Sequence, residues 1–377
     1  DLAILTIIAP DDDAFQTYLN KRGFTSISDM PVNEVSKLIG YHVLYYSYNK
    51  EKLVNFRPTG STETEEEQNI KAGLYYKHRT RSSDAPTVET TPTGASVMVY
   101  HLERYLPIFS YRYFQTKGID AKNNYEAFYP NSTWTGDDGF NVSNASVKEY
   151  GIIANNGYIH AVDRVVEPLE TIYTELKNKE KYSTFLDLYD SFGVYVADDE
   201  LSKSYAKAYG VDTLYQYQHG GLPNIACEWP TSSYLNFTAL TALSYSIFAP
   251  SNTAINSFFD SFWKIGGYSS MQEVDALALN YFLYQFIYGG SMLFPEELGD
   301  DELKNLAGSS LNINPAALNE KTMCVNGALY GMDEIKEPST FASVIGPLFQ
   351  YKSARSFLYA LLGSSLFSSY VSDLSKY

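Results

Sequence analysis

Two sequence signatures occur twice along the chain, in the same order, and this repeat constrains the fold more than any single residue does. An apolar segment that ends in Ala-Pro and a polar turn lies at 5–15 and again at 245–255. A segment that begins with Asn-Gly and ends on Pro lies at 156–168 and again at 326–338. Self-similarity on this scale indicates repeated structural units. The sequence therefore predicts two related domains, each carrying both signatures.

Each signature is typical of a local structure. The apolar alternation before Pro10 and Pro250 suits a strand, which proline ends because it cannot donate a hydrogen bond to the ladder. The polar residues after each proline can cap a following helix. The Asn-Gly dipeptides favour hairpin turns. We expect strands at 3–10, 155–167, 243–250 and 322–336, and helices at 31–44, 180–191, 272–286 and 354–362.

A Tyr-His pair in mid-domain and an Asn-Gly-x-Ile-His strand that closes on Asp complete a pattern that resembles the fasciclin-like (FAS1) family. The first domain has all of these features, whereas the second has Gln285 and Tyr330 at the two histidine positions. The motif positions are Tyr41, His42, His160, Asp163, Gln285, Tyr330 and Asp333. The resemblance implies an α+β fold of tandem FAS1 domains, each a wedge-like β-sandwich with packed helices.

The resemblance also implies how the chain divides. Residues 1–168 form the first domain without its leading helices, and 169–338 form the second. The segment at 354–362 parallels the one that opens the second domain, so 339–377 is expected to hold the leading helices of a third domain in a longer protein. The alternative is a two-domain protein with a helical tail, which would leave apolar surface of the first domain uncovered.

The first domain carries a large insertion at about 85–148. We expect short added strands within it at 97–100, 106–109 and 111–114. Its aromatic residues Tyr125, Tyr129 and Trp134 lie among amide side chains and are candidates for binding a partner or a glycan, since such rings combine apolar area with a polar tip. The alternative is that they fill a small core of the insertion itself. The second domain lengthens its opening instead, with tyrosines at 205, 209, 215 and 217.

Composition places the protein outside the cytoplasm. The chain has 34 Tyr, only 2 Cys and a net charge of −16, and this charge argues against nucleic acid and anionic lipid as partners. No apolar run is long enough to span a membrane. Tyr-rich acidic FAS1 proteins resemble Bacteroidota surface lipoproteins, a likeness suggested by the stretches 74–81 and 128–132. The resemblance implies a cell-surface or outer-membrane protein held at the membrane by an N-terminal anchor outside this sequence.

The two cysteines allow two interpretations. Cys227 and Cys324 both fall in the second domain, and a disulfide between them would stabilise the fold in an oxidising compartment. They can equally be two buried thiols packed as small apolar groups. Two isolated cysteines without histidines at ligand spacing do not predict a zinc site, and we expect no metal and no cofactor.

No catalytic motif is present: a nucleophile elbow, a phosphate-binding loop and a zinc-protease helix are all missing from the sequence. If His42 and His160 were a general acid–base pair, the second domain would be expected to keep them, yet it has Gln285 and Tyr330 instead, and glutamine does not transfer protons near neutral pH. We therefore interpret both histidines as buried hydrogen-bonding groups, Asp163 and Asp333 as structural, and the protein as not an enzyme.

The remaining hypotheses are binding roles. The first is a surface scaffold that binds another cell-surface or outer-membrane protein, such as a nutrient-uptake complex. The second is a glycan-binding module that stacks sugar rings on the aromatic residues of the insertion. A flat apolar patch on the insertion would favour a protein partner, whereas a groove with two parallel exposed rings would favour polysaccharide. An enzyme with a diffuse site is the least supported hypothesis.

Overall fold

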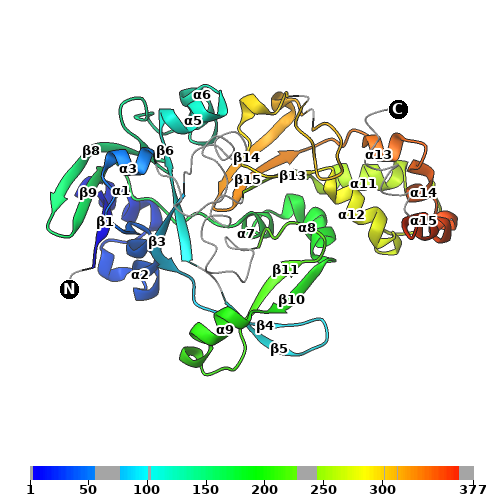
Figure 1. The fold of residues 1–377 in the computed structure, drawn as a ribbon, viewed down its shortest axis with the longest axis horizontal. Coiled ribbons are helices and arrows are strands. Elements are labelled where there is room, and N and C mark those ends of the chain that lie inside the picture. Colours follow the sequence, from blue (N-terminus) through cyan, green and yellow to red (C-terminus); the bar gives the residue numbers. More distant parts are fainter. Residues whose placement is uncertain are drawn as a thin grey trace. The chain divides into compact units, whose positions relative to one another are not determined.

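The computed structural model describes residues 3–55, 77–100, 103–226, 244–300, 302–311 and 313–364 (Figure 1). Helices and strands mix throughout, which confirms the α+β prediction. The chain forms two compact units, the first built from residues up to Thr171 and from 195–218, the second from 172–194, 219–225 and the residues after 243. Within the described ranges, no helix is both long and apolar enough to cross a membrane.

The first unit is built around a sheet that closes on itself. Its strands, in hydrogen-bonded order, are β1 (Leu5–Pro10), β2 (Val43–Tyr45), β3 (Lys77–Ser83), β6 (Glu103–Phe109), β7 (Asn141–Val142), β8 (Ala145–Ala154) and β9 (Gly157–Val162). The interior is filled by apolar side chains from these strands, including Ile8, Leu44, Leu106, Val142 and Val162. The predicted β-sandwich is therefore a closed barrel, because the insertion strands β6 and β7 join the two ends of the sheet.

Helices of the first unit surround this barrel. They are α1 (Asp12–Arg22), η1 (Ile27–Asp29), α2 (Val32–Tyr41) and α3 (Lys50–Val54). Helix α1 begins directly after the proline, where Asp11 accepts a hydrogen bond of 2.8 Å from the Ala14 amide, and it ends at Gly23, whose φ of 77° suits a residue without a side chain. A second apolar cluster joins α1 to α2 through Tyr18, Leu19 and Leu38.

The insertion contains helices that the sequence did not predict. Its elements are β4 (Thr87–Thr90), β5 (Ser96–Val99), β6, α5 (Tyr111–Lys117), α6 (Ala121–Phe128) and β7. The strands expected at 97–100 and 106–109 are confirmed as β5 and β6, but the strand expected at 111–114 is wrong. Ser110 caps α5 through the Tyr113 amide, and Gly118 ends it at φ 71°, so these flanking residues turn an aromatic run into a helix.

Residues from the opening of the second domain complete a second sheet in the first unit. They form β10 (Gly193–Ala197), α9 (Asp199–Tyr205), η3 (Ala206–Tyr209) and β11 (Tyr215–His219). Within the described part of the chain, this sheet has four strands in the order β10-β11-β5-β4. Two segments that the sequence shows only as separate additions thus pair with each other, and we call their product the insertion sheet.

The second unit contains a sheet in the order β13-β12-β15-β14. Its strands are β12 (Tyr245–Pro250), β13 (Ile287–Gly289), β14 (Leu318–Cys324) and β15 (Gly327–Met332). Its helices are α7 (Ile172–Lys177), η2 (Glu180–Tyr182), α8 (Ser183–Asp190), α11 (Asn252–Ser261), η4 (Met271–Glu273), α12 (Ala276–Tyr284), η5 (Pro295–Glu297) and η6 (Pro315–Ala317). The strand expected at 243–250 and the helices expected at 180–191 and 272–286 are confirmed by β12, α8 and α12, whereas the strand expected at 322–336 is divided by a turn into the end of β14 and β15.

The repeat is visible in the strand pairing of both units. Strand β1 runs parallel to β9, with Leu5 opposite Gly157, and β12 runs parallel to β15, with Tyr245 opposite Gly327. The antiparallel neighbours β2 and β13 pair with β1 and β12 in the same way. The Ile8 amide donates to the His42 carbonyl at 2.8 Å, and the equivalent Phe248 amide donates to the Phe286 carbonyl at 2.9 Å. Phe286 therefore takes the place of His42 in the strand register, whereas Gln285 matches His42 as the C-cap of its helix and bonds, as His42 does, to the carbonyl four residues earlier.

The C-terminal helices follow the second unit's sheet. They are α13 (Ser339–Ala342), α14 (Gly346–Gln350), η7 (Lys352–Ala354) and α15 (Arg355–Leu362). The expected helix at 354–362 is confirmed by α15. The order of a short helix, a 3-10 turn and a longer helix matches α7, η2 and α8 at the start of the unit. Their assignment to a third domain remains a prediction.

Candidate functional site

His42 joins a helix end to a distant segment in the interior of the first unit. Its Nδ1 lies 2.9 Å from the Leu38 carbonyl oxygen, and its Nε2 accepts a hydrogen bond of 3.0 Å from the Val166 amide. Burial lowers the pKa of the ring below its ordinary value, which favours the neutral form that both contacts require. The arrangement agrees with a structural role and leaves neither ring nitrogen for proton transfer.

His160 in the first unit and Tyr330 in the second unit make equivalent hydrogen bonds. The His160 Nε2 lies 2.9 Å from the Tyr48 carbonyl oxygen, and the Tyr330 hydroxyl donates to the Leu293 carbonyl at 2.7 Å. In each unit the receiving residue also donates its amide to a buried hydroxyl, that of Thr6 or Ser246. Both side chains are fully buried. Tyr330 therefore makes the same hydrogen bond in the second unit that His160 makes in the first, as expected for side chains with a structural role.

Gln285 and Tyr41 hold helix ends in place. The Gln285 amide nitrogen donates to the Tyr281 carbonyl at 3.2 Å, one turn earlier in α12, and its oxygen accepts from Asn305 at 3.3 Å. The buried Tyr41 hydroxyl donates to the Tyr105 carbonyl at 2.8 Å. Each of these side chains bonds to groups of the fold itself.

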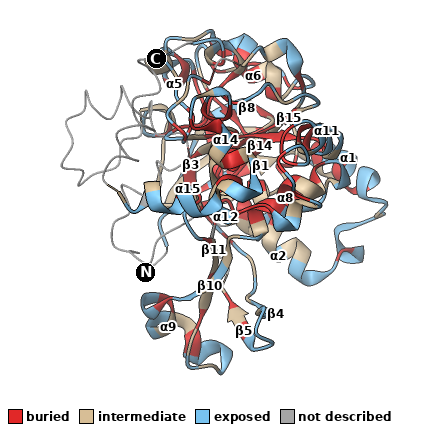
Figure 2. Ribbon diagram, turned by 90° about the vertical axis from the view of Figure 1, so that its right-hand side faces the viewer, coloured by how far each residue is buried: buried red, intermediate tan, exposed pale blue. Residues whose placement is uncertain are grey.

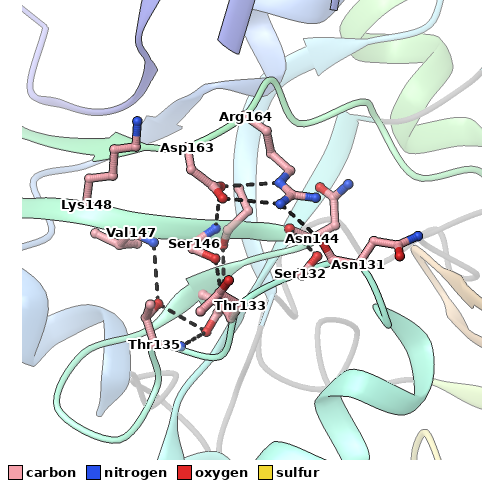
Figure 3. A network of polar contacts seen from close by, with 12 residues as sticks. Asn131, Ser132, Thr133, Thr135, Asn144, Ser146, Val147, Lys148, Asp163 and Arg164 are labelled. Atoms are coloured by element: carbon pink, nitrogen blue, oxygen red, sulfur yellow. Dashed lines mark hydrogen bonds and ion pairs between the residues drawn. The ribbon is translucent and has the colours of Figure 1, made fainter. Parts of the chain in front are cut away.

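Asp163 organises a polar network at the end of β9 (Figure 3). Its carboxylate accepts a hydrogen bond of 2.7 Å from the Ser146 amide and pairs with Arg164 at 3.2 Å. The Ser146 hydroxyl continues the network by donating to the Thr133 carbonyl at 2.6 Å, and Arg164 reaches the Asn131 carbonyl at 3.2 Å. The network ties the barrel to the loop that follows α6.

Asp333 occupies the equivalent place in the second unit but makes a different contact. It pairs with Lys181 at 2.9 Å, and both side chains are about half exposed. The pKa of Asp333 is lowered, first by the hydrogen bond from Lys181. The two repeated aspartates therefore share a position in the sequence pattern, while only Asp163 bonds to a backbone amide of a buried strand.

This difference predicts that removing the two aspartate side chains lowers the free energy of unfolding by unequal amounts. We expect Asp163→Ala to lower the free energy of unfolding by about 1–3 kcal/mol, because the amide of the buried Ser146 loses its acceptor. Asp333→Ala is the matched control and should cost about 0–1 kcal/mol, the range for an exposed ion pair. Chemical denaturation of both variants measures the difference. Equal losses would contradict the assignment of Asp163 to a buried hydrogen bond.

The candidate binding residues of the insertion lie inside it. Tyr125 and Trp134 are buried, with ring centres 5.1 Å apart, and Tyr129 is partly exposed with its ring 5.3 Å from Tyr125. The Tyr125 hydroxyl donates to the Ser143 carbonyl at 2.9 Å. Tyr125 and Trp134 therefore do not present a face on which a sugar could stack, and the expectation of a glycan platform at these residues is corrected. Their burial agrees with the alternative, a small core of the insertion.

A shallow polar hollow of about 240 Å³ lies between α1, α2 and the segment 167–170. Its charged side chains pair with one another: Arg22 contacts Glu34 at 3.0 Å, and Lys37 contacts Glu170 at 3.9 Å. Nearby, the buried Arg104 bonds to Asp84 and Glu170. Burial raises the pKa of Asp84, but the charges of Arg104 and Lys37 outweigh it and hold that pKa below its ordinary value. We interpret this region as an ion-pair network that fastens the helices.

The insertion sheet is the region that the sequence reasoning missed as a unit. Val88 on β4 is 69% exposed and stands opposite Met98 on β5, and Val196 on β10 is 40% exposed. On the neighbouring position of β10, Tyr195 packs its ring 5.0 Å from Tyr217 and so faces the other side. Strand β4 is drawn mostly as exposed in Figure 2. One side of the sheet therefore carries Tyr195 and Tyr217, and the other exposes Val88 and Val196.

The signal that could have revealed this sheet is alternation. Thr87, Val88 and Glu89 alternate polar and apolar residues, and Val194, Tyr195 and Val196 form a short run of β-branched and aromatic residues, which also favours a strand. The pairing of β5 with β11, however, joins segments more than a hundred residues apart, Val99 with Tyr215, and local patterns do not reveal long-range partners.

The cysteines and possible metal ligands add no site. Cys324 is buried at the end of β14, while Cys227 lies outside the described residues, so the choice between a disulfide and two buried thiols is not tested. Among the residues that the structure describes, no three His, Cys, Asp or Glu side chains gather in a way that could hold a metal ion.

Comparison with known proteins does not identify a family for this chain. No family model matches the chain, and no curated protein matches it. Among solved structures, the chain is similar to a FAS1 domain pair from the insect cell adhesion molecule fasciclin I, at 12% identity, over 89% of this chain and 90% of that one, with a TM-score of 0.28. A similarity at this level does not assign the chain to the family.

Proposed function

We propose that the protein is a non-catalytic, extracytoplasmic scaffold that binds a partner protein through the insertion sheet. The observation that carries the proposal is the exposure of Val88 and Val196 on one side of that sheet, with the half-buried Met98 opposite Val88. Exposed apolar patches on a folded surface mark interaction sites. Functional surfaces also concentrate on segments added to a shared scaffold, and both halves of this sheet are such segments.

The buried histidines support the non-catalytic part of the proposal. His42 and His160 hold backbone groups on both ring nitrogens, and Tyr330 replaces one of them in the second unit without loss of the contact. General acid–base chemistry needs a group that can reach a substrate proton, and these rings are enclosed. A protein partner is favoured over a glycan because Val88 and Val196 expose aliphatic side chains on the insertion sheet, while the nearby rings of Tyr195 and Tyr217 pack on each other.

The cellular setting is proposed from the sequence resemblance alone. A surface lipoprotein of the outer membrane, attached by an N-terminal lipid anchor, would place the scaffold beside other envelope proteins such as nutrient-uptake complexes. The net charge of −16 suits a protein that avoids direct adsorption to anionic lipid.

The test is capture of the partner from the native cell envelope by wild-type and variant proteins. We expect the double variant Val88→Asp and Val196→Asp to lose a partner that the wild type recovers in stoichiometric amount, because two charges would have to be desolvated at the interface. Val32→Asp is the matched control, since Val32 is 84% exposed but belongs to α2 and not to the insertion sheet. Equal recovery by wild type, control and double variant would overturn the assignment of the surface.

A further inference from the structure

The insertion sheet ends at β4, whose outer edge has no strand beside it among the described residues. The sheet order is β10-β11-β5-β4, so β4 pairs with β5 alone. The Thr91 amide donates to the Ala95 carbonyl at 2.8 Å, which turns Thr91 toward β5. Because residues of an antiparallel strand alternate between facing the neighbouring strand and facing away, Val88 and Thr90 direct their amide and carbonyl groups outward.

The hydrogen bonds of β5 agree with this orientation of β4. The Tyr100 amide, directly after β5, donates to the Tyr215 carbonyl of β11 at 2.9 Å. Met98 lies two residues earlier and therefore also faces β11, so its counterpart Val88 faces away from β5. In the described part of the chain, neither Val88 nor Thr90 takes part in a backbone hydrogen bond outside the pairing with β5. Both residues are exposed, and their outward groups can pair with a further strand.

Strand β4 lacks the features that prevent an edge strand from pairing with another chain. It holds no lysine and no proline, and its register with β5 is continuous. By contrast, β14, an edge strand of the second unit's sheet, carries Glu320 and Lys321 and has a shift of register after Leu318. Lysines and bulges on an edge strand discourage the addition of a strand. Strand β4 therefore keeps an edge to which a strand can be added.

Glu89 determines which charge the added strand should carry. It is the one charged residue between 85 and 100, and its carboxylate accepts hydrogen bonds of 3.0 Å from the hydroxyls of both Tyr195 and Thr87. These bonds hold the carboxylate on the side of the sheet opposite to Val88. Side chains directly opposite each other on neighbouring strands are in contact, and opposite charges stabilise such a pair. A lysine or arginine beside Glu89 and an apolar residue beside Val88 therefore complement this edge.

We propose that the partner binds by adding an extended strand to β4, with a basic residue beside Glu89 and an apolar residue beside Val88. The inference rests on the function proposed above and names the part of the partner that the insertion sheet recognises. The occupant is a strand because outward amide and carbonyl groups at every second residue are satisfied together by another extended backbone. The charge of Glu89 selects the basic residue, and the side that exposes Val88 and Val196 selects the apolar one.

A synthetic peptide of alternating valine and lysine is the probe, and fluorescence anisotropy with the intact chain measures its binding. We expect Thr90→Pro to weaken binding at least about tenfold, because proline removes the outward amide and leaves a peptide carbonyl without a donor. Thr90→Ala keeps this amide and is the matched control, so it should bind like the wild type. The two variants have the same charge, so general attraction of the peptide to the acidic protein affects them equally.

Two further measurements locate the contact. Hydrogen exchange at the amides of Val88 and Thr90 should become slower when the wild type binds the peptide, and this result does not depend on the folding of a variant. Glu89→Gln should bind the valine–lysine peptide about two- to fivefold less tightly than the wild type does. A peptide of alternating valine and glutamine should bind the wild type and Glu89→Gln equally.

Equal binding by Thr90→Pro and Thr90→Ala would overturn the proposal, and so would a wild type that does not bind the valine–lysine peptide. The function proposed above is judged separately, by whether the variant with both Val88→Asp and Val196→Asp loses the native partner. If that variant loses the partner and Thr90→Pro keeps it, the sheet binds through its exposed side and not through its edge. A chain that dimerises alone, but not as Thr90→Pro, would assign the edge to a second copy and also overturn the proposal.

Discussion

Replacing Gly157 with alanine is expected to lower the free energy of unfolding of the first unit by more than about 3 kcal/mol. A β-carbon at this position would lie 1.7 Å from the carbonyl oxygen of Leu5, a backbone atom of the parallel neighbour β1. Side-chain rotation cannot relieve a contact with backbone. Strand β1 would have to move away from β9, and the alignment of Ile8 with His160 in the barrel wall would move with it.

Gly327→Ala is expected to do the same to the second unit. Its β-carbon would lie 1.9 Å from the Tyr245 carbonyl oxygen, and its φ of 142° is a conformation that alanine rarely adopts. Gly299→Ala is the matched control, because nothing lies within 4 Å of the added carbon, and it should change stability by less than about 0.5 kcal/mol.

Scanning calorimetry of the three variants measures these effects. We expect Gly157→Ala and Gly327→Ala each to lower a different unfolding transition, which would assign one transition to each unit. A Gly157→Ala protein that unfolds like the Gly299→Ala control would contradict the close approach of β1 to β9.

These glycines show what the sequence could and could not predict. The Asn-Gly pairs predict a turn followed by a strand, and β9 and β15 confirm the strands. The repeat predicts that both glycines share a role. Local sequence patterns could not predict the close contact with Leu5 or Tyr245. The contact depends on parallel pairing of Leu5 with Gly157 and of Tyr245 with Gly327, residues far apart in the chain. Turn propensities describe only neighbouring residues and carry no information about such pairing.

The sequence-based predictions that the structure corrects also depend on interactions that local sequence patterns do not show. The aromatic run that starts at Tyr111 matches a strand by composition, but the caps at Ser110 and Gly118 decide in favour of a helix. Gln285 matches His42 at the helix end, but strand pairing puts Phe286 in register with His42, and this shift of one residue is visible only in the pairing. Trp134 was a candidate for binding because aromatic composition is the same in a core and on a surface, and only packing separates the two.

Acid is expected to unfold the first unit before the second. His42, His78 and His160 all lie in the first unit and are buried. Burial lowers the pKa of each ring below the ordinary value of 6.5, and for His78 the pKa falls to about 3. Transfer of a charged imidazolium into these sites is unfavourable, so the folded unit keeps the rings neutral.

The sign of the pH effect follows from proton binding. Between the lowered pKa of the folded state and 6.5, the unfolded chain binds more protons than the folded unit, so stability decreases as the pH falls. The contribution is fully present above 6.5 and is lost below it, by about 1.4 kcal/mol per pH unit for a histidine that stays neutral when folded. His78 alone should cost about 2 kcal/mol between about pH 7 and about pH 5.

Glutamine at position 78 provides the decisive variant. His78→Gln keeps a donor and an acceptor but does not titrate, so we expect the transition assigned to the first unit by Gly157→Ala to depend less steeply on pH. His160→Gln should have the same effect for the same reason. Measurements above about pH 5 exclude any effect of Asp84. Because the pKa of Asp84 is lowered, its contribution to stability is lost only as the pH falls below about 3.8. Burial, and not a nearby charge, is the main cause of the lowered pKa of all three rings, so added salt should leave the dependence of stability on pH unchanged. If His78→Gln had the same pH dependence as the wild type, the assignment of His78 as a neutral buried histidine would be contradicted.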